Sequence, residues 1–379
     1  MKSFYFTLLA PVALALFASS AKAAQSHADA FSDEGLTKAD VASLPNTQFL
    51  AHPDLPLDKD KNVIWCGTLQ LAWNSAIDLV GEKLQFVTQP PVVDLLNQED
   101  FTSADLDPNC YVAVADFEKN HVEDKIRAAL QKTFGGAASP ELIPEPEKNP
   151  QPYDFVAYSY LFKNLQFAKP FAKNTEFNFE DHPVKSFGFL ERKSSLDPAI
   201  FLQVRINDYQ SPDDFIITLQ TKATDDDLIL AKIAPGATMQ ETITSVMQRI
   251  AAQNGHWENP GTRDSLAVPD LNFDLKKSFK ELVGLNLKPG PNIKVDNLVT
   301  EKVEQLVRFQ LNEKGAVLKS EAVIQMVGAM AMANEPPPYE LLFDKPFLIL
   351  MKQAKSDKPY FAMWVGNSAL LIPGLSDKN

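Results

Sequence analysis

The amino-acid sequence predicts an α+β fold. Thr68 to Val80 and His121 to Phe134 have helical periodicity, whereas short runs of aromatic and branched residues, which are typical of strands, dominate from Asp154 onward. A proline-rich connection at residues 137–153 separates the two regions and is incompatible with a helix or a central strand. We find no internal repeat.

The composition is that of a globular protein with a sizeable core. The 379 residues are 45% apolar and 22% charged, and the length allows either two or three domains or one large one. The formal charge of −13 argues against a nucleic-acid partner, because affinity for phosphate requires cations. The 27 prolines against 15 glycines indicate rigid turns rather than flexible linkers.

Residues 1–23 have the pattern of a cleaved secretory signal. A cationic start at Lys2 precedes an apolar run, Phe4 to Phe17, and Ala21-Lys22-Ala23 provides the small-x-small cleavage pattern. We therefore expect a secreted or periplasmic protein whose charge becomes −15 when Lys2 and Lys22 are removed from −13. The alternative is a retained anchor, for which the run is short. No later stretch approaches a membrane span, so no membrane partner is expected.

Two helices are predicted in the first half of the chain. Residues 24–60 are polar and are interpreted as a flexible N-terminal arm. One helix follows at Thr68 to Val80, where Gly81 closes an apolar face. Another is predicted from His121 to Phe134, with acids near its start and bases near its end, as the helix dipole prefers.

The second half is predicted to contain short strands and one helix. The predicted strands are Phe155 to Phe162, Ala199 to Ile206, Asp214 to Leu219, Phe347 to Met351 and Tyr360 to Val365. The helix covers about Met239 to Asn254. A segment at Val303 to Leu311 precedes a long run of small and flexible apolar residues, Ala316 to Asn334, and then three prolines.

Cys66 and Cys110 have two interpretations. In an oxidising compartment they could form one disulfide that closes a loop of about 45 residues. Alternatively, each is a small buried hydrophobic residue. The sequence leaves both open, because it does not show whether the two thiols are within bonding distance.

The chain lacks the motifs of common enzymes. Its glycines do not have the spacings of dinucleotide, phosphate-loop or nucleophile-elbow motifs, and its five histidines lack the i, i+4 pairing of a zinc-protease helix. Glu180-Asp181-His182 could bind a metal, but consecutive side chains diverge, which favours a solvated turn. We therefore expect a protein that is not an enzyme, with no catalytic residue, metal or cofactor.

Five sequence elements resemble the serpins and occur in the family's order. They are Asn62 to Gly67 leading into a helix; Tyr158 to Asn174, with Phe162-Lys163-Asn164 and Lys169-Pro170-Phe171; Val268 to Leu275; the hinge-like Asn312-Glu313-Lys314-Gly315; and Phe343 to Leu350 followed by Pro359 to Asn367. The resemblance covers about residues 60–373. It implies one serpin-like domain at 61–373, with mixed β-sheets surrounded by helices and an exposed reactive-centre-like loop.

The chain also departs from the family pattern. Cys66 to Leu69 replace the Ser-Pro-x-Ser of inhibitory members, and Gln305 stands where the shutter histidine is expected. Phe167, with one residue inserted, is the match for the breach tryptophan. The stretch between the first helix and the breach strand is shorter than usual. The predicted hinge residues are Glu313, Lys314, Gly315 and Ala316. After the hinge glycine, inhibitors carry Thr and then small residues, whereas after Gly315 this chain carries Ala316, Val317, Leu318, Lys319, Ser320 and Glu321.

The resemblance implies a loop that is cut and then inserts as a strand of the large sheet. Alternation from Gly315 assigns one face of that strand to Ala316, Leu318, Ser320 and Ala322 and the other face to Val317, Lys319, Glu321 and Val323. Insertion is therefore permitted, although the bulk of Val317 and Leu318 would slow it. An alternative is that Ala322 to Ala333 form an ordinary core helix or strand.

The resemblance also places the scissile bond within a short window. The candidates are Gly328, Ala329, Met330, Ala331, Met332, Ala333 and Asn334. They imply a target protease that prefers small apolar or Met side chains, elastase-like or subtilisin-like, acting on a monomer. The acidic charge gives no basic patch for heparin. The alternative is a non-inhibitory homologue that acts as a secreted binding or structural protein.

Overall fold

The α+β fold class is confirmed by the structure, a computed structural model that describes residues 27–174, 176–190, 197–290, 293, 298–317, 319–320 and 338–374. The signal segment 1–23 and the scissile-bond candidates Gly328 to Asn334 lie outside the described residues, as does the proposed core element at Ala322 to Ala333.

Three sheets and two hairpins make up the β-structure of the described residues. The hinge sheet contains, in order, β1 (Thr37–Asp40), β15 (Leu271–Ser278), β16 (Glu304–Asn312), β17 (Gly315–Ala316), β6 (Asn164–Gln166) and β18 (Lys319–Ser320). The core sheet contains β11 (Val204–Ser211), β12 (Asp214–Leu219), β13 (Asp226–Lys232), β20 (Phe347–Gln353), β21 (Pro359–Val365), β3 (Asn62–Cys66) and β2 (Thr47–Phe49). The small sheet contains β19 (Glu340–Leu342), β14 (Ser265–Pro269), β10 (Ser186–Phe189) and β7 (Ala172–Asn174). The hairpins are β4 (Tyr111–Phe117) with β5 (Phe155–Leu161), and β8 (Asn178–Phe179) with β9 (His182–Pro183).

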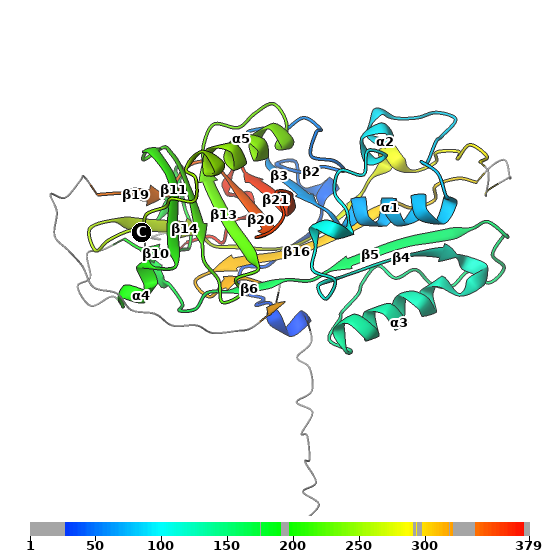
Figure 1. The fold of residues 1–379 in the computed structure, drawn as a ribbon, viewed down its shortest axis with the longest axis horizontal. Coiled ribbons are helices and arrows are strands. Elements are labelled where there is room, and N and C mark those ends of the chain that lie inside the picture. Colours follow the sequence, from blue (N-terminus) through cyan, green and yellow to red (C-terminus); the bar gives the residue numbers. More distant parts are fainter. Residues whose placement is uncertain are drawn as a thin grey trace, which may run out of the picture.

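The helices lie around these sheets (Figure 1). They are α1 (Thr68–Val80), α2 (Pro91–Leu96), α3 (Val122–Phe134), α4 (Pro198–Phe201) and α5 (Met239–Ala252). Short 3₁₀ turns cover Ala28–Ala30, Val41–Ser43, Ser103–Asp105, Glu118–Asn120, Lys280–Leu282 and Ser368–Leu370. Figure 1 shows α1 and α3 on opposite sides of the β4–β5 hairpin. Within the described ranges, no helix combines the length and the apolar character that crossing a membrane requires.

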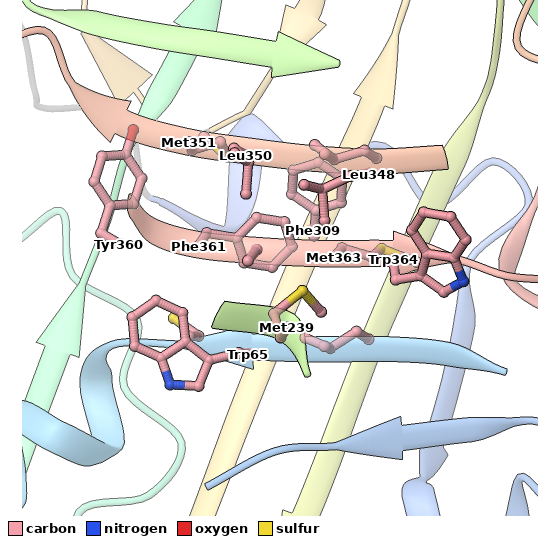
Figure 2. Close-up of a cluster of buried hydrophobic side chains, with 14 of the residues drawn as sticks. Trp65, Met239, Phe309, Leu348, Leu350, Met351, Tyr360, Phe361, Met363 and Trp364 are labelled. Atoms are coloured by element: carbon pink, nitrogen blue, oxygen red, sulfur yellow. The ribbon is translucent and has the colours of Figure 1, made fainter. Parts of the chain in front are cut away.

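The hydrophobic core joins the hinge sheet to the core sheet. Figure 2 shows Phe309 of β16 against Phe361 of β21, and their ring centroids are 4.7 Å apart. Trp65 of β3 and Met239 of α5 lie in the same cluster. Because β16 contributes its apolar face to this core, the hinge sheet is held over the core sheet.

The strongest helix predictions are confirmed, and one strand prediction is wrong in part. α1 ends at Gly81, whose φ of 80° is the left-handed conformation that glycine adopts readily. Ala199 to Ile206 is not one strand, because α4 occupies Pro198–Phe201 and β11 begins at Val204. The Asp197 carboxylate accepts a hydrogen bond from the Ala199 amide, and this cap starts a helical turn ahead of the strand.

The predicted flexible N-terminal arm contains two paired strands within its described part, residues 27–60. β1 pairs in parallel with β15, and β2 pairs in parallel with β3. The side-chain amide of Asn272 also donates to the backbone carbonyls of Ser32 and Glu34, at 2.8 Å each. Backbone pairing and this amide hold the segment without a long apolar run, so its polar composition was a poor guide to its order.

Candidate functional site: the hinge and the adjacent cleft

The four predicted hinge residues, Glu313 to Ala316, lie in a tight reversal that follows β16. The Asn312 carbonyl side-chain oxygen accepts a hydrogen bond from the Lys314 amide at 2.9 Å and shapes the turn. The chain then runs back as β17 between β16 and β6, with Ala316 opposite Leu311 on one side and Leu165 on the other. The start of the predicted loop is therefore already a strand of the hinge sheet.

Gly315 is required for this close approach of two strands. Its φ is 139°, and a Cβ atom at this position would lie 2.3 Å from the Leu165 carbonyl oxygen. Ala316 is fully buried, whereas Lys314 is exposed. Gly315 therefore has no room for a side chain, whereas Lys314 and Ala316 on either side of it each carry one.

Phe167, the residue matched to the breach tryptophan, contacts the hinge directly. Its backbone amide donates to the Lys314 carbonyl at 2.9 Å. Its ring lies 4.9 Å from that of Phe171 and 5.9 Å from that of Phe187, measured between centroids. Phe167 therefore packs an aromatic side chain beside the hinge residues.

The hinge residue Glu313 and the neighbouring Asp270 both have buried carboxyl groups. Asp270, only 5% exposed, has a pKa raised to about 7, first by burial and then by the negative charge of Glu313. Lys173 and Lys185 lower this pKa in part, and the Lys173 ammonium lies 3.6 Å from the Glu313 carboxylate. One Asp270 carboxylate oxygen is buried with no hydrogen-bond partner. The positive charges of Lys173 and Lys185 therefore offset only part of the effect that burial and Glu313 have on the pKa of Asp270.

An open cleft adjoins the hinge between β5 and β16. Its volume is about 970 Å³, and it is lined by residues 154–162 on one wall and by residues 298–309 on the other. Within the described residues, β5 pairs with β4 alone, and β16 pairs with β15 along its length and with β17 only at Leu311 and Asn312. The remaining edges of both strands face the cleft, and unpaired strand edges are templates for another strand.

The start of α1 connects the two walls of the cleft. Gln305 of β16 donates from its side-chain amide to the Cys66 carbonyl at 2.9 Å and to the Thr68 hydroxyl at 2.8 Å. The Ser159 hydroxyl of β5 donates to the Thr68 carbonyl at 2.5 Å. Gln305 thus makes polar contacts at the position where the resemblance predicts a histidine.

The same cleft has an acidic side. The pKa of Glu118, which lines the cleft, is raised by burial and then by the neighbouring acids Asp154, Glu123, Glu147 and Glu301. One Glu118 carboxylate oxygen is buried without a hydrogen-bond partner. The electrostatic potential here disfavours an anionic segment.

The two cysteines are free thiols and are buried. Burial raises the pKa of both, to about 11 for Cys110, so the reactive thiolate is scarce at neutral pH. The buried-thiol interpretation therefore describes this structure, and the disulfide does not.

The predicted turn at Glu180 to His182 is confirmed, since it joins β8 to β9 and Glu180 has a φ of 51°. A different group among the described residues places its ligand atoms within 4.8 Å of one another: His52, Asp54 and Asp100. The sequence did not indicate it, because Asp100 is far from the other two along the chain.

Comparisons with known proteins give a likeness of fold. No family model matches the chain, and no curated protein matches it. Serpin48 from the insect Tenebrio molitor, described as highly specific, is 13% identical over 81% of this chain and 92% of its own, with a TM-score of 0.41. A serpin from the trematode Schistosoma haematobium is 12% identical over 81% and 94%, with a TM-score of 0.42. Thyroxine-binding globulin, in complex with thyroxine, is 12% identical over 88% and 95%, with a TM-score of 0.41. Serpins are among the solved structures that the chain resembles.

Proposed function

We propose that this chain is a secreted or periplasmic, monomeric, serpin-like inhibitor of serine or cysteine proteases, with its serpin-like domain at residues 61–373. The observation that carries the proposal is the position of the hinge. β17 lies between β16 and β6 and pairs with β16 at Leu311, two residues beyond Phe309, which lines a cleft that two strand edges face. A chain that continued from Ala316 into the cleft would extend a strand that already exists.

The proposed mechanism is suicide inhibition. The protease nucleophile attacks a carbonyl within Gly328 to Asn334, the peptide bond breaks, and the new amine leaves with the C-terminal part of the chain. The protease remains as an acyl-enzyme. Insertion of the freed segment into the cleft then displaces the protease before water hydrolyses the ester. The small apolar and Met side chains at these positions suit an elastase-like or subtilisin-like pocket.

A non-inhibitory binding or structural protein is the second candidate, and Val317 favours it. This branched residue follows the buried Ala316, and Leu318 comes next in the sequence. Bulky residues at the start of insertion slow it, and slow insertion releases the protease after ordinary cleavage. The two candidate functions therefore differ in the rate of loop insertion rather than in fold.

The test is to mix the chain lacking residues 1–23 with an elastase-like and a subtilisin-like protease. The inhibitor proposal predicts an adduct that survives SDS and has the mass of the protease plus the chain without its C-terminal fragment. Ala316→Arg should convert the inhibitor into a substrate, because Ala316 is fully buried, and Lys314→Ala is the matched control at an exposed hinge position. Clean cleavage of the natural chain, with no adduct and no gain in heat resistance, would contradict inhibition.

A further inference from the structure

The segment 27–34 lies across the cleft and contacts both of its walls. On the β5 side, the His27 ring stacks on Phe162 with centroids 3.6 Å apart and an interplanar angle of 3°. A His27 ring nitrogen also lies 2.9 Å from the Tyr160 hydroxyl. The His27 backbone amide donates to the Ala137 carbonyl at 2.8 Å, beyond the end of α3. These contacts fix the beginning of the segment to the wall that β5 forms.

The following residues are fixed to the opposite wall. The Arg308 guanidinium of β16 lies over the Phe31 ring, 4.5 Å from its centroid, and also 3.2 Å from the Asp33 carboxylate. The Ser32 amide donates to the Gln310 side chain at 3.2 Å. Because β1 then pairs with β15, the segment is anchored to the hinge sheet beyond this point.

The segment also occupies part of the space beside the cleft. His27, Ala28 and Phe31 are themselves among the residues that line it. Side chains alternate along a strand, so a strand seated between β5 and β16 would direct every second side chain toward one face of the hinge sheet. On the face where His27 and Phe31 lie, these rings would meet the incoming side chains.

We propose that residues 27–34 form an autoinhibitory strap that ties β5 to β16 and must release before a strand can enter the cleft. This regulation rests on the proposed function, since that function supplies the strand that enters. The strap itself is a property of the uncut chain. Any change that detaches it, such as proteolytic trimming of the N-terminal segment, would accelerate insertion.

The strap is tested first without a protease, by hydrogen–deuterium exchange of the chain lacking residues 1–23. The double variant Phe31→Ala, Asp33→Ala removes both contacts to Arg308 and should speed exchange in residues 155–162 and 304–310 by about tenfold. Trp257→Ala is the matched control, because the Arg205 guanidinium lies 4.6 Å from the Trp257 ring centroid in an equivalent contact on β11. Phe31→Tyr keeps the ring and should restore slow exchange when Asp33 is intact.

The second measurement is the rate of adduct formation with the protease. We expect the double variant to form the adduct faster than the natural chain, with Trp257→Ala unchanged. Faster exchange in both walls with no adduct in any variant would refute the inhibitor proposal and leave the strap supported. Unchanged exchange in both walls would refute the strap proposal. An adduct that forms equally fast in the natural chain and in the double variant, despite faster exchange, would also refute it.

Discussion

Asp270→Asn should stabilise the protein in a pH-dependent manner. Asp270 is 5% exposed, and its pKa is raised from 3.8 to about 7 by burial and by Glu313. Between these two values the unfolded chain loses the proton while the folded chain keeps it, so the natural protein loses stability as pH rises through this range. Well below pH 3.8 both states are protonated and the penalty vanishes.

The shift sets the size of the effect. A difference of about three pKa units corresponds to about 4 kcal/mol, which is an upper limit because the structure around a buried charge relaxes. Asparagine retains the shape and cannot ionise. We therefore expect the free energy of unfolding of Asp270→Asn to exceed that of the natural protein by roughly 2–4 kcal/mol at pH 8.5 and by less than about 1 kcal/mol at pH 4.

The assay is urea unfolding at pH 4, 5.5, 7 and 8.5, with reversibility checked at each pH. Asp60→Asn is the control, since the Asp60 side chain is 80% exposed. An advantage for Asp270→Asn that is equal at pH 4 and pH 8.5 would show that shape rather than charge is responsible. A loss of stability at pH 8.5 would refute the reasoning outright.

Three further changes test the hinge, the cleft and the thiols. Gly315→Ala should loosen β17 and lower the free energy of unfolding by about 1–3 kcal/mol, because its Cβ would lie 2.3 Å from the Leu165 carbonyl oxygen. Hydrogen exchange at residues 315–316 should then be faster, and unchanged exchange would contradict the clash. Gln305→Leu should lower the unfolding free energy by roughly 1–3 kcal/mol, since it removes the side-chain amide that donates to the Cys66 carbonyl at 2.9 Å. Denaturant unfolding measures this change, and no loss of stability would mean that the hydrogen bond is dispensable. Cys110 should resist a thiol reagent at pH 8 until urea unfolds the chain, because burial raises its pKa to about 11. Rapid labelling of Cys110 in the native protein would contradict this burial.

The sequence predicted the parts of the fold that depend on local signals. The helices at Thr68–Val80 and Val122–Phe134 have apolar periodicity and glycine stops, and both are present. By contrast, β1 and β2 were missed, because their pairing with β15 and β3 depends on backbone and distant partners rather than on an apolar pattern.

The candidate site was predicted as a list of residues but not as an arrangement. Gln305 was noted only as a departure, yet its amide reaches two groups at the start of α1. Neither the raised pKa of Asp270 nor the contact of Phe31 with Arg308 could be predicted, since each depends on residues that are distant from one another along the chain. Such contacts are set by topology, which a single sequence does not display.

The order of strands in the core sheet has a consequence for folding. β3, near the start of the chain, pairs with β21 near its end, and the register joins Trp65 to Ala362. A ribosome must therefore finish almost the whole polypeptide before this sheet can close. Contacts of such high sequence separation slow folding and expose unpaired edges for longer. Newly made chains should consequently depend on chaperones more than their size alone would require.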